Sequence, residues 1–304
     1  MKRAEHSHLP YATLSDTGLV RNHNEDFIGI TAFAPASELV PESLLCVLCD
    51  GVGGHLGGET ASRLAVEGIS AYIEATDGSS PVIQLTNAIQ SASNAIWQTG
   101  QSQTDLHGMA TTTACAWIIG KRLFIATAGD SRIYLIRRGK VHQISTDHTW
   151  VQDALDAGEI SRTELKDHPN AHVIKRYLGS EKAPEVDVRL KLNDNPDKNM
   201  QGMLLDSGDL LFMCSDGVSD LIQESELVSM LKAGDLELSL ETIKQLAYQR
   251  GASDNLSMVV VKIPSSATPA NRKLKFLRLL FFSLIVLLAA FIGMYFGWLV
   301  LFSP

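Results

Sequence analysis

The chain has 304 residues, of which 45% are hydrophobic, and carries 26 basic side chains against 34 acidic ones, for a formal net charge of −8. With only 10 prolines and 4 cysteines, it is not a disulfide scaffold, a collagen-like repeat or a disordered polar chain. Residues 264–304 hold four basic residues and no acid, so residues 1–263 carry 22 basic and 34 acidic groups, a net charge of −12. A basic face for nucleic acid is therefore not expected.

Four segments are expected along the chain. Residues 1–10 form a flexible N-terminus, which lacks the apolar run of a signal peptide. Residues 11–263 contain no break rich in Pro, Gly or Ser, which favours one large domain. A basic linker over 264–278 leads to an apolar helix over 279–302.

Within the large domain, short runs rich in β-branched residues predict strands that follow one another closely. Gly120-Lys121 and Gly139-Lys140 are predicted hairpin turns, so the sheets are expected to be largely antiparallel. The predicted strands cover residues 12–17, 27–32, 44–49, 111–119, 123–128, 133–137, 210–214 and 256–263.

Helices are predicted in two pairs between and after these strands. Small and apolar residues recur with helical spacing over 61–73, and a second helix begins on Pro81 and runs to residue 99. The late pair covers 224–231 and 238–249. Clustered strands with paired helices predict a layered α+β domain and not a βαβ series.

The four cysteines are predicted to be buried thiols, as suits a reducing compartment. Each of them, Cys46, Cys49, Cys115 and Cys214, lies in an apolar run. Cys46 and Cys49 spell C-x-x-C within a predicted strand, where residues three apart point to opposite faces. A redox or metal-binding pair is therefore not expected there.

Residues 279–302 form a stretch of 24 residues without a charge, long enough at about 1.5 Å per residue to cross a hydrocarbon core of roughly 30 Å. The sequence predicts a single transmembrane helix as a tail anchor; a buried core helix is the alternative. The basic residues of 272–278 precede it and none follows, which favours a large domain on the cytoplasmic side and contact with anionic headgroups. Ala289, Gly293 and Gly297 would let two spans pack closely as a homodimer, although a monomer stays open.

Acidic residues stand at the ends of predicted strands. Asp50 and Asp216 each follow a buried strand and precede a glycine, Asp254 precedes the last strand, and Glu25-Asp26 precede another. Burying such charges costs free energy unless a cation binds them, so four places of this kind predict a shared cation site. Oxygen ligands with no Cys or His pair suit Mg²⁺ or Mn²⁺ better than Zn²⁺. Two such ions could hold a nucleophilic water for a phosphate group.

Other chemistries lack their motifs. A cysteine phosphatase needs Cys and Arg six positions apart, and no cysteine here has that arginine. The nucleotide-binding P-loop, the serine-hydrolase elbow and the zinc-protease motif are also missing from the sequence. A single Asp-Gly would be an ordinary turn, so the metal-site hypothesis depends on the full set of acids.

Five motifs stand in order along the chain: Arg21-x-x-x-Glu25-Asp26, Asp50-Gly51-x-Gly53-Gly54, Gly129-Asp130-Ser131-Arg132, Ser215-Asp216-Gly217-x-x-Asp220 and Ser253-Asp254-Asn255. This ordered set resembles the metal-dependent protein phosphatase family of the PP2C type over nearly all of residues 11–263. Residues 146–149, 156–160, 168–170 and 178–179 resemble the flap of bacterial members, which would place the anchor in the bacterial inner membrane. The resemblance implies a four-layer αββα sandwich, two antiparallel sheets flanked by helix pairs.

The resemblance also implies a role for each matching residue. Asp50 would bridge two Mn²⁺ or Mg²⁺ ions, with Asp216 and Asp254 on one ion and Glu25 with the Gly51 carbonyl on the other. Asp26 would hold metal-bound water, Arg21 would bind the phosphate oxygens, and Asp130 and Asp220 would bind a third, weaker ion.

The implied activity is hydrolysis of phosphoserine or phosphothreonine on proteins, substrates of an opposing Ser/Thr kinase, by a metal-bridging hydroxide without a phosphoenzyme. Animal-type members carry a proposed general acid, His, directly after the Asp-Gly, where this chain has Val52. His55 is nearby without matching that position, and metal-bound water is the other candidate acid. Two alternatives stay open: a phosphatase for another phosphorylated substrate, and a catalytically silent regulatory module.

Overall fold

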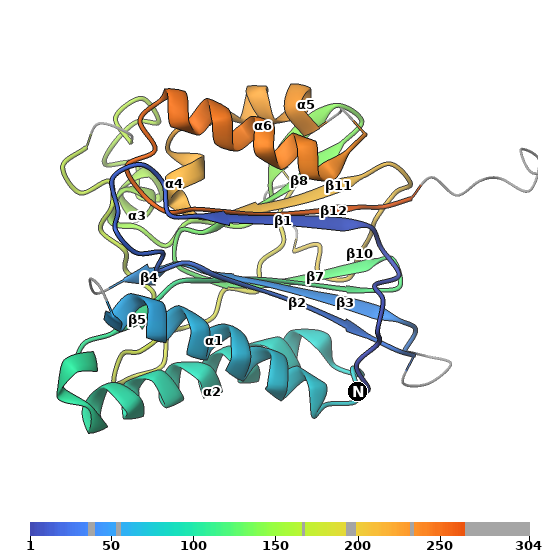
Figure 1. Ribbon diagram of the computed structural model, residues 1–304, viewed down its shortest axis with the longest axis horizontal. Helices are drawn as coiled ribbons and strands as arrows, with labels where there is room; N and C mark the ends of the chain where they lie inside the picture. The colour runs from blue at the N-terminus through green and yellow to red at the C-terminus, as the bar shows by residue number, and fades with distance from the viewer. Residues whose placement is uncertain (36–39, 53–55, 166–167, 193–198, 232–233, 265–304) are drawn as a thin grey trace, which may run out of the picture. The chain divides into compact units, whose positions relative to one another are not determined.

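Two antiparallel five-stranded sheets pack face to face, and a helix pair covers the outer side of each (Figure 1). The computed structural model describes residues 1–35, 40–52, 56–165, 168–192, 199–231 and 234–264. These residues belong to one compact unit, Met1–Pro264. The layered α+β arrangement expected from the sequence is confirmed.

The first sheet has the strand order β10-β7-β6-β3-β2, and α1 and α2 cover it. Its strands and helices are β2 (Phe27–Phe33), β3 (Ser43–Cys49), β6 (Thr113–Ile119), β7 (Arg122–Ala128), β10 (Met203–Leu204), α1 (Leu56–Glu74) and α2 (Pro81–Ser102). A short pair, β4 (Gly51–Val52) with β5 (Ala110–Thr111), and a turn of 3₁₀ helix over Thr104–Leu106 complete this half.

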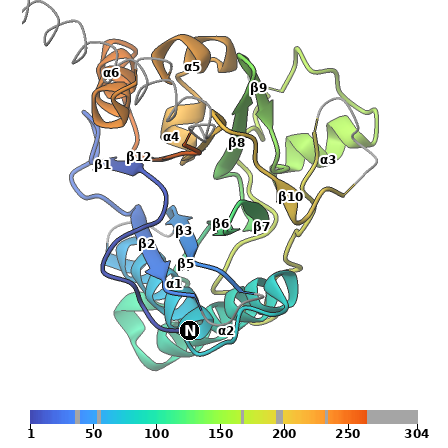
Figure 2. The ribbon, with the colours of Figure 1, turned by 90° about the vertical axis from the view of Figure 1, so that its right-hand side faces the viewer.

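The second sheet has the strand order β1-β12-β11-β8-β9, and α5 and α6 cover it. Figure 2, a view turned by 90°, shows α3 apart from both helix pairs. The elements are β1 (Tyr11–Asp16), β8 (Arg132–Arg137), β9 (Lys140–Gln143), α3 (Trp150–Asp156), β11 (Leu210–Cys214), α4 (Asp216–Ser219), α5 (Glu224–Leu231), α6 (Leu236–Gln249) and β12 (Leu256–Lys262).

The core has three layers because each sheet is covered on both faces. Strand β3 shows this, since all seven of its residues are buried. Cys46 packs between the two sheets, whereas Cys49 packs under α1 and α2. The expectation that these two cysteines point to opposite faces is confirmed, and all four cysteines are free and buried.

Two details differ from the sequence-based expectations. The predicted strand 111–119 is divided at Thr112 into β5 and β6. The β8–β9 hairpin turns on Arg138 and Gly139, both with positive φ, instead of on Gly139-Lys140, and Arg137 pairs with Lys140. A two-residue turn of this kind needs φ > 0 at both positions, and here an arginine adopts it.

Residues 1–10, expected to be flexible, are held by the first half of the molecule. The Ala4 N–H donates to the Ala32 carbonyl at 2.8 Å, and the side chain of Arg3 pairs with Glu74 at 2.7 Å. Leu9 is buried between the sheets. The segment therefore runs beside β2 as part of the fold.

The predicted membrane span, 279–302, with its linker and with Ala289, Gly293 and Gly297, lies outside the described residues. Within the part of the chain that the structure describes, no helix is both long and apolar enough to cross a membrane.

Candidate metal centre

The acidic residues meet because the sheet registers bring the strand ends together at one end of the sandwich. Phe27 pairs with Cys49, so Asp26 and Asp50 stand at neighbouring ends of β2 and β3. In the other sheet Cys214 pairs with Met258, which places Asp216 beside the residues that precede β12. Four segments distant in the sequence thus converge there.

A cavity of about 460 Å³ opens at this end. It contains seven of the residues for which the sequence predicts a role in metal or phosphate binding. These are Arg21, Glu25, Asp50, Gly51, Asp216, Asp220 and Asp254. Of the other predicted residues, Asp26 and Asp130 are not part of the lining and lie buried close by.

Burial and mutual repulsion act on the central carboxylates. Asp50 and Asp216 share a hydrogen bond, and burial raises the pKa of both above the ordinary value. Burial, followed by the neighbouring acids, raises the pKa of Asp130 to about 8. Burial also raises the pKa of Asp26 to about 7, although Ser215 and Ser257 oppose it with hydrogen bonds. Protein contacts therefore do not compensate these charges.

Within the described part of the chain, two buried carboxylate oxygens of this cluster have no hydrogen-bond partner: Oδ1 of Asp26 and Oδ1 of Asp130. Such atoms cost free energy unless something outside the chain binds them. A group of carboxylate oxygens with few protein donors is the ligand set that Mg²⁺ and Mn²⁺ prefer. The residues present therefore fit hard divalent cations.

Backbone hydrogen bonds fix Asp50 in place. Its N–H donates to Thr112 Oγ1 at 3.0 Å, and its carbonyl accepts from the Thr112 N–H at 2.8 Å. The following N–H, that of Gly51, donates to the Glu25 carbonyl at 3.1 Å. A Cβ at Gly51 would stand 2.4 Å from the Gly58 carbonyl oxygen, so only glycine fits between these segments. Glu25 is thereby held beside Asp50.

Arg21 points its guanidinium at the cluster. Its Nη2 donates to Asp254 Oδ2 at 2.7 Å, and this hydrogen bond raises the pKa of Arg21 above its ordinary value. About half of the side chain is exposed to solvent. The guanidinium of Arg21 thus lies at the cavity wall, where it can also contact a ligand in the cavity.

Asp26 is held behind the cavity. Its Oδ2 accepts a hydrogen bond from Ser215 Oγ at 2.8 Å, and Ser215 Oγ in turn accepts from the Ser257 N–H at 3.1 Å. Only 5% of Asp26 is exposed. The carboxylate is therefore oriented by the second sheet although it belongs to the first.

Asn255 belongs to one of the predicted motifs but was not expected to have a role. In the structure its side chain joins the two halves of the site. Its Oδ1 accepts from the Glu25 N–H at 2.8 Å. Its Nδ2 donates to the carbonyls of Thr17 and His23 at 3.0 and 2.9 Å. This buried amide fixes the loop of Arg21 and Glu25 against β12, and its position directly after Asp254 was the available signal.

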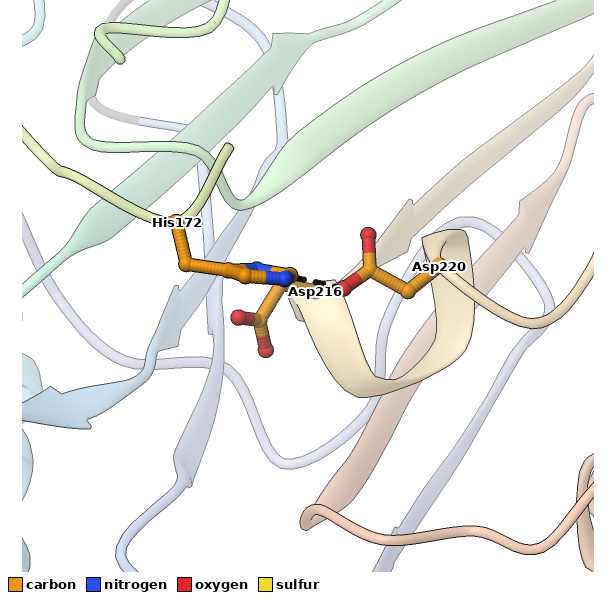
Figure 3. A group of neighbouring side chains, drawn as sticks. All are labelled: His172, Asp216 and Asp220. Atoms are coloured by element: carbon orange, nitrogen blue, oxygen red, sulfur yellow. Dashed lines mark ion pairs between the residues drawn. The ribbon is translucent and has the colours of Figure 1, made fainter. Parts of the chain in front are cut away.

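The two residues expected to share a third ion are placed differently. Asp130 is 7% exposed and faces Asp216 and Asp147, whereas Asp220 is partly exposed and lines the cavity. His172, which sequence reasoning did not single out, stands with Nδ1 3.6 Å from Asp220 Oδ2 (Figure 3). Its place in the flap-like region was a signal, but the sequence does not reveal which loop faces α4.

Val52 lines the cavity at the position where animal-type members have the proposed acid. An aliphatic side chain cannot donate a proton. His55, the neighbouring candidate, lies outside the described residues.

Comparisons with known proteins agree with this fold. The family described as Protein phosphatase 2C matches residues 22–247. The serine/threonine protein phosphatase PstP of Mycobacterium tuberculosis is 33% identical over 256 residues, which are 84% of this chain and 45% of that relative. The chain therefore spans less than half the length of PstP.

Two further similarities cover nearly the whole of the related chain. The serine/threonine phosphatase stp of Listeria innocua is 30% identical over 253 residues, 82% of this chain and 93% of that relative. A crystal structure of the catalytic domain of the phosphatase PstP in complex with two manganese ions has a TM-score of 0.67 and 32% identity, covering 84% of this chain and 99% of that one. The chain belongs to the protein phosphatase 2C family.

Proposed function

We propose that this chain is a metal-dependent phosphatase that hydrolyses phosphoserine and phosphothreonine on proteins. The observation that carries the proposal is the convergence of Glu25, Asp50, Asp216 and Asp254 on one cavity that also contains Arg21. Related chains named serine/threonine phosphatases support the substrate class. The structure of a relative with two manganese ions supports the cofactor.

In this proposal Asp50 would contact both Mn²⁺ or Mg²⁺ ions, Asp216 and Asp254 would hold one, and Glu25 with the Gly51 carbonyl would hold the other. When bound, the ions supply Lewis-acid stabilisation of the phosphate and make water a stronger nucleophile at neutral pH. Their charge also offsets the acidic body, which would otherwise repel a phosphate dianion.

The remaining residues act on the substrate and on water. Arg21 leaves Asp254 and donates two parallel hydrogen bonds to the phosphate oxygens, which suits a planar guanidinium. Asp26, held by Ser215, accepts a hydrogen bond from the water that attacks phosphorus in line with the leaving oxygen. Asp130 and Asp220 would hold a third, weaker ion. With Val52 unable to donate a proton, water would protonate the leaving alkoxide.

The proposal includes a location. A single membrane helix over 279–302 would tether the domain to the cytoplasmic face, which in a bacterium is the inner membrane. The uncharged stretch and the basic residues before it support this. Close packing at Ala289, Gly293 and Gly297 would allow a homodimer. A protease-protection assay on membrane vesicles tests on which side the domain lies. Extraction of the membranes with salt tests the tether, and release of the chain by high salt alone would contradict it.

A tethered phosphatase would act on proteins phosphorylated by a Ser/Thr kinase that reaches the same membrane surface. Residues 1–263 carry a net charge of −12, so acidic residues beside the phosphorylated residue of a substrate should weaken its binding. A panel of phosphopeptides with acidic and neutral flanks would test this, with faster turnover expected for neutral flanks.

The direct test of the activity is hydrolysis of a phosphothreonine peptide by the full-length chain in mild detergent. Turnover is expected with Mn²⁺ or Mg²⁺, none with EDTA, and none in Asp50→Asn. Turnover of small phosphate esters but of no phosphopeptide would move the assignment to another phosphorylated substrate. Mn²⁺ binding by a folded chain without any turnover would indicate a regulatory module.

A further inference from the structure

Large apolar side chains are exposed around the mouth of the cavity. In the loop between β1 and β2, Leu19 is 56% exposed and Val20 is 66% exposed, and these two form an apolar patch directly before Arg21. Val52, in the cavity lining, is exposed as well, and so is Val173, which lies between two lining residues. Single exposed apolar residues are normal on a protein surface, whereas a group of them around a site is typical of a surface that binds a partner.

The loop that carries the apolar patch is fixed by hydrogen bonds and close packing. The Leu19 N–H donates to the Ala252 carbonyl at 2.8 Å. Gly18 has a φ of +78°, and a Cβ there would stand 2.2 Å from the Asp254 carbonyl oxygen, so the loop packs directly on that segment. The amide of Asn255 donates to backbone carbonyls on both sides of the patch. An ordered loop therefore presents both apolar side chains to solvent.

The position of the patch beside Arg21 determines which part of a substrate can reach it. In the proposed function Arg21 binds the phosphate, so the peptide on either side of the phosphorylated residue must cross the mouth of the cavity. An extended chain advances at most about 3.5 Å per residue, and Leu19 is two residues from Arg21. A substrate side chain one to three positions from the phosphorylated residue therefore comes within reach of the patch.

An apolar substrate side chain fits this patch better than a charged one. Contact between apolar side chains removes both from water, which is favourable. A charged side chain of either sign would lose hydration against Leu19 and Val20 without gaining a partner there. A carboxylate would in addition meet a domain whose residues 1–263 carry a net charge of −12.

The place of the patch in the fold argues against two other occupants. Strand β12 begins directly after Asp254 and Asn255 and runs to the opposite end of the sandwich, where the described domain ends at Pro264 (Figure 1). A partner at that end, such as a bilayer, would not cover the patch. A second copy of the chain seated on the patch would lie over the mouth of the cavity and exclude the substrate.

We propose that Leu19 and Val20 bind an aliphatic or aromatic side chain close to the phosphorylated residue of the substrate. The preferred substrates are then phosphorylated segments with apolar flanks, and not merely segments without acidic ones. This inference rests on the proposed function, because the phosphate at Arg21 determines where the peptide lies.

The first test compares phosphothreonine peptides that carry either leucine or serine at one position, from three residues before to three residues after the phosphothreonine. The full-length chain in mild detergent is compared with Leu19→Ser and with Leu238→Ser, whose side chain on α6 is 58% exposed and lies outside the cavity. The quantity measured is the ratio of kcat/KM for the leucine peptide to that for the serine peptide within each protein, which does not depend on the fraction of active enzyme.

At the best position we expect a ratio of about ten in the unaltered chain and in Leu238→Ser, and of about three or less in Leu19→Ser, where Val20 remains. A ratio near one at every position in the unaltered chain would overturn the proposal. An equal ratio in Leu19→Ser and Leu238→Ser would overturn it too.

A second measurement locates the contact without turnover. A phosphothreonine peptide with a photoreactive leucine at the best position, or next to the phosphothreonine if no position is preferred, is crosslinked to Asp50→Asn in the presence of Mn²⁺. We expect mass spectrometry to find label on residues 17–21, reduced at least about threefold when Leu19→Ser is added and unchanged when Leu238→Ser is added. Label on other segments with none on 17–21 would contradict the proposed contact.

The two measurements separate failure of this inference from failure of the proposed function. Equal turnover of all the peptides, with label away from 17–21, would overturn the apolar patch and leave the phosphatase assignment in place. Label on 17–21 without turnover of any phosphopeptide by the unaltered chain would contradict the phosphatase assignment and leave the patch as a surface that binds phosphopeptides.

Discussion

Two sets of aspartates are buried to the same depth and have opposite electrostatic surroundings. Asp26 and Asp130 are 5% and 7% exposed, and Asp187 and Asp209 are 5% and 2% exposed. Around the first set stand other carboxylates, whereas the second set faces cations of the chain. Depth of burial therefore does not decide whether a carboxylate is compensated; the partner does.

Asp187 shows the compensated case. Burial alone would raise its pKa, but hydrogen bonds from His148 and Arg189 outweigh burial and lower the pKa below its ordinary value. The His148 Nε2 lies 3.1 Å from its Oδ2. Asp209 likewise accepts a hydrogen bond of 2.6 Å from Arg137. These acids stabilise the fold, while the acids at the cavity destabilise the metal-free fold and need a ligand from outside.

The largest expected effect comes from Asp50→Asn. It removes the carboxylate that both proposed ions share, so kcat/KM for a phosphothreonine peptide should fall by about a thousandfold or more, several kcal/mol of transition-state stabilisation. Urea unfolding in EDTA should show a metal-free stability equal to or above that of the unaltered chain, because one repelling charge is gone. A large loss of metal-free stability would mean that Asp50, like Asp187 and Asp209, stabilises the fold without a metal ion.

The two sets also predict opposite responses to pH in the metal-free chain. Unfolded carboxyls titrate near pH 4, whereas Asp26 and Asp130 in the fold titrate near 7 and 8, so the folded chain binds more protons between these values. The free energy of unfolding should therefore fall by a few kcal/mol as pH rises from about 4 to about 8. The lowered pKa of Asp187 has the opposite effect. Its ionised carboxylate adds to the free energy of unfolding above about pH 4, and this stabilisation is lost as pH falls below that value.

Urea unfolding over this pH range, with EDTA and with Mn²⁺, checks the prediction. Mn²⁺ favours the ionised carboxylates, so it should remove the loss of stability near neutral pH. A metal-free stability that rises steadily from pH 4 to pH 8 would contradict the division into two sets.

Asp187→Asn tests the aspartates that face cations of the chain. It leaves His148 and Arg189 without their anion and should lower the free energy of unfolding by about 2 kcal/mol, less than for a fully buried pair because Arg189 is partly exposed. The Mn²⁺ affinity of the folded chain, measured by calorimetry below its unfolding temperature, should stay within about threefold. A variant of unchanged stability that binds Mn²⁺ poorly would mean that Asp187 belongs to the metal centre.

The smallest predicted effect is that of Arg21→Lys. The half-exposed side chain contributes little to stability, but lysine cannot make two parallel hydrogen bonds to a phosphate. We expect kcat/KM to fall by about tenfold, which corresponds to one charged hydrogen bond, with the unfolding midpoint unchanged. Unaltered kinetics would leave Arg21 as a partner of Asp254 alone.

The fold was predictable where local patterns are strong. Continuous apolar runs such as Leu210–Cys214 gave strands, and the helix that begins on Pro81 was placed correctly at its start. The two-residue strands β4, β5 and β10 and the four-residue helix α4 carry no periodicity, so tertiary packing alone defines them. The turn at Arg138 was missed because a positive φ at arginine is unusual.

The site was predictable as a set of acids at strand ends, since charged residues there are costly without a cation. Their convergence on one cation site was predicted from the acids alone, whereas the role of each residue at that site depended on the resemblance to a family, because strand order cannot be read from the residues. His172 and Asn255 were not assigned roles, since their positions depend on which loops meet across the two sheets. The roles in metal and phosphate binding remain predictions for every residue of the set.

The most direct test of the central claim is the stabilisation of the chain by Mn²⁺ at neutral pH, measured by urea unfolding in three proteins. Mn²⁺ should stabilise the unaltered chain and Asp187→Asn by the same free energy, as expected for binding to the folded state alone, and should stabilise Asp50→Asn much less. Equal stabilisation of Asp50→Asn and the unaltered chain would show that the buried acids at the cavity do not form the metal centre.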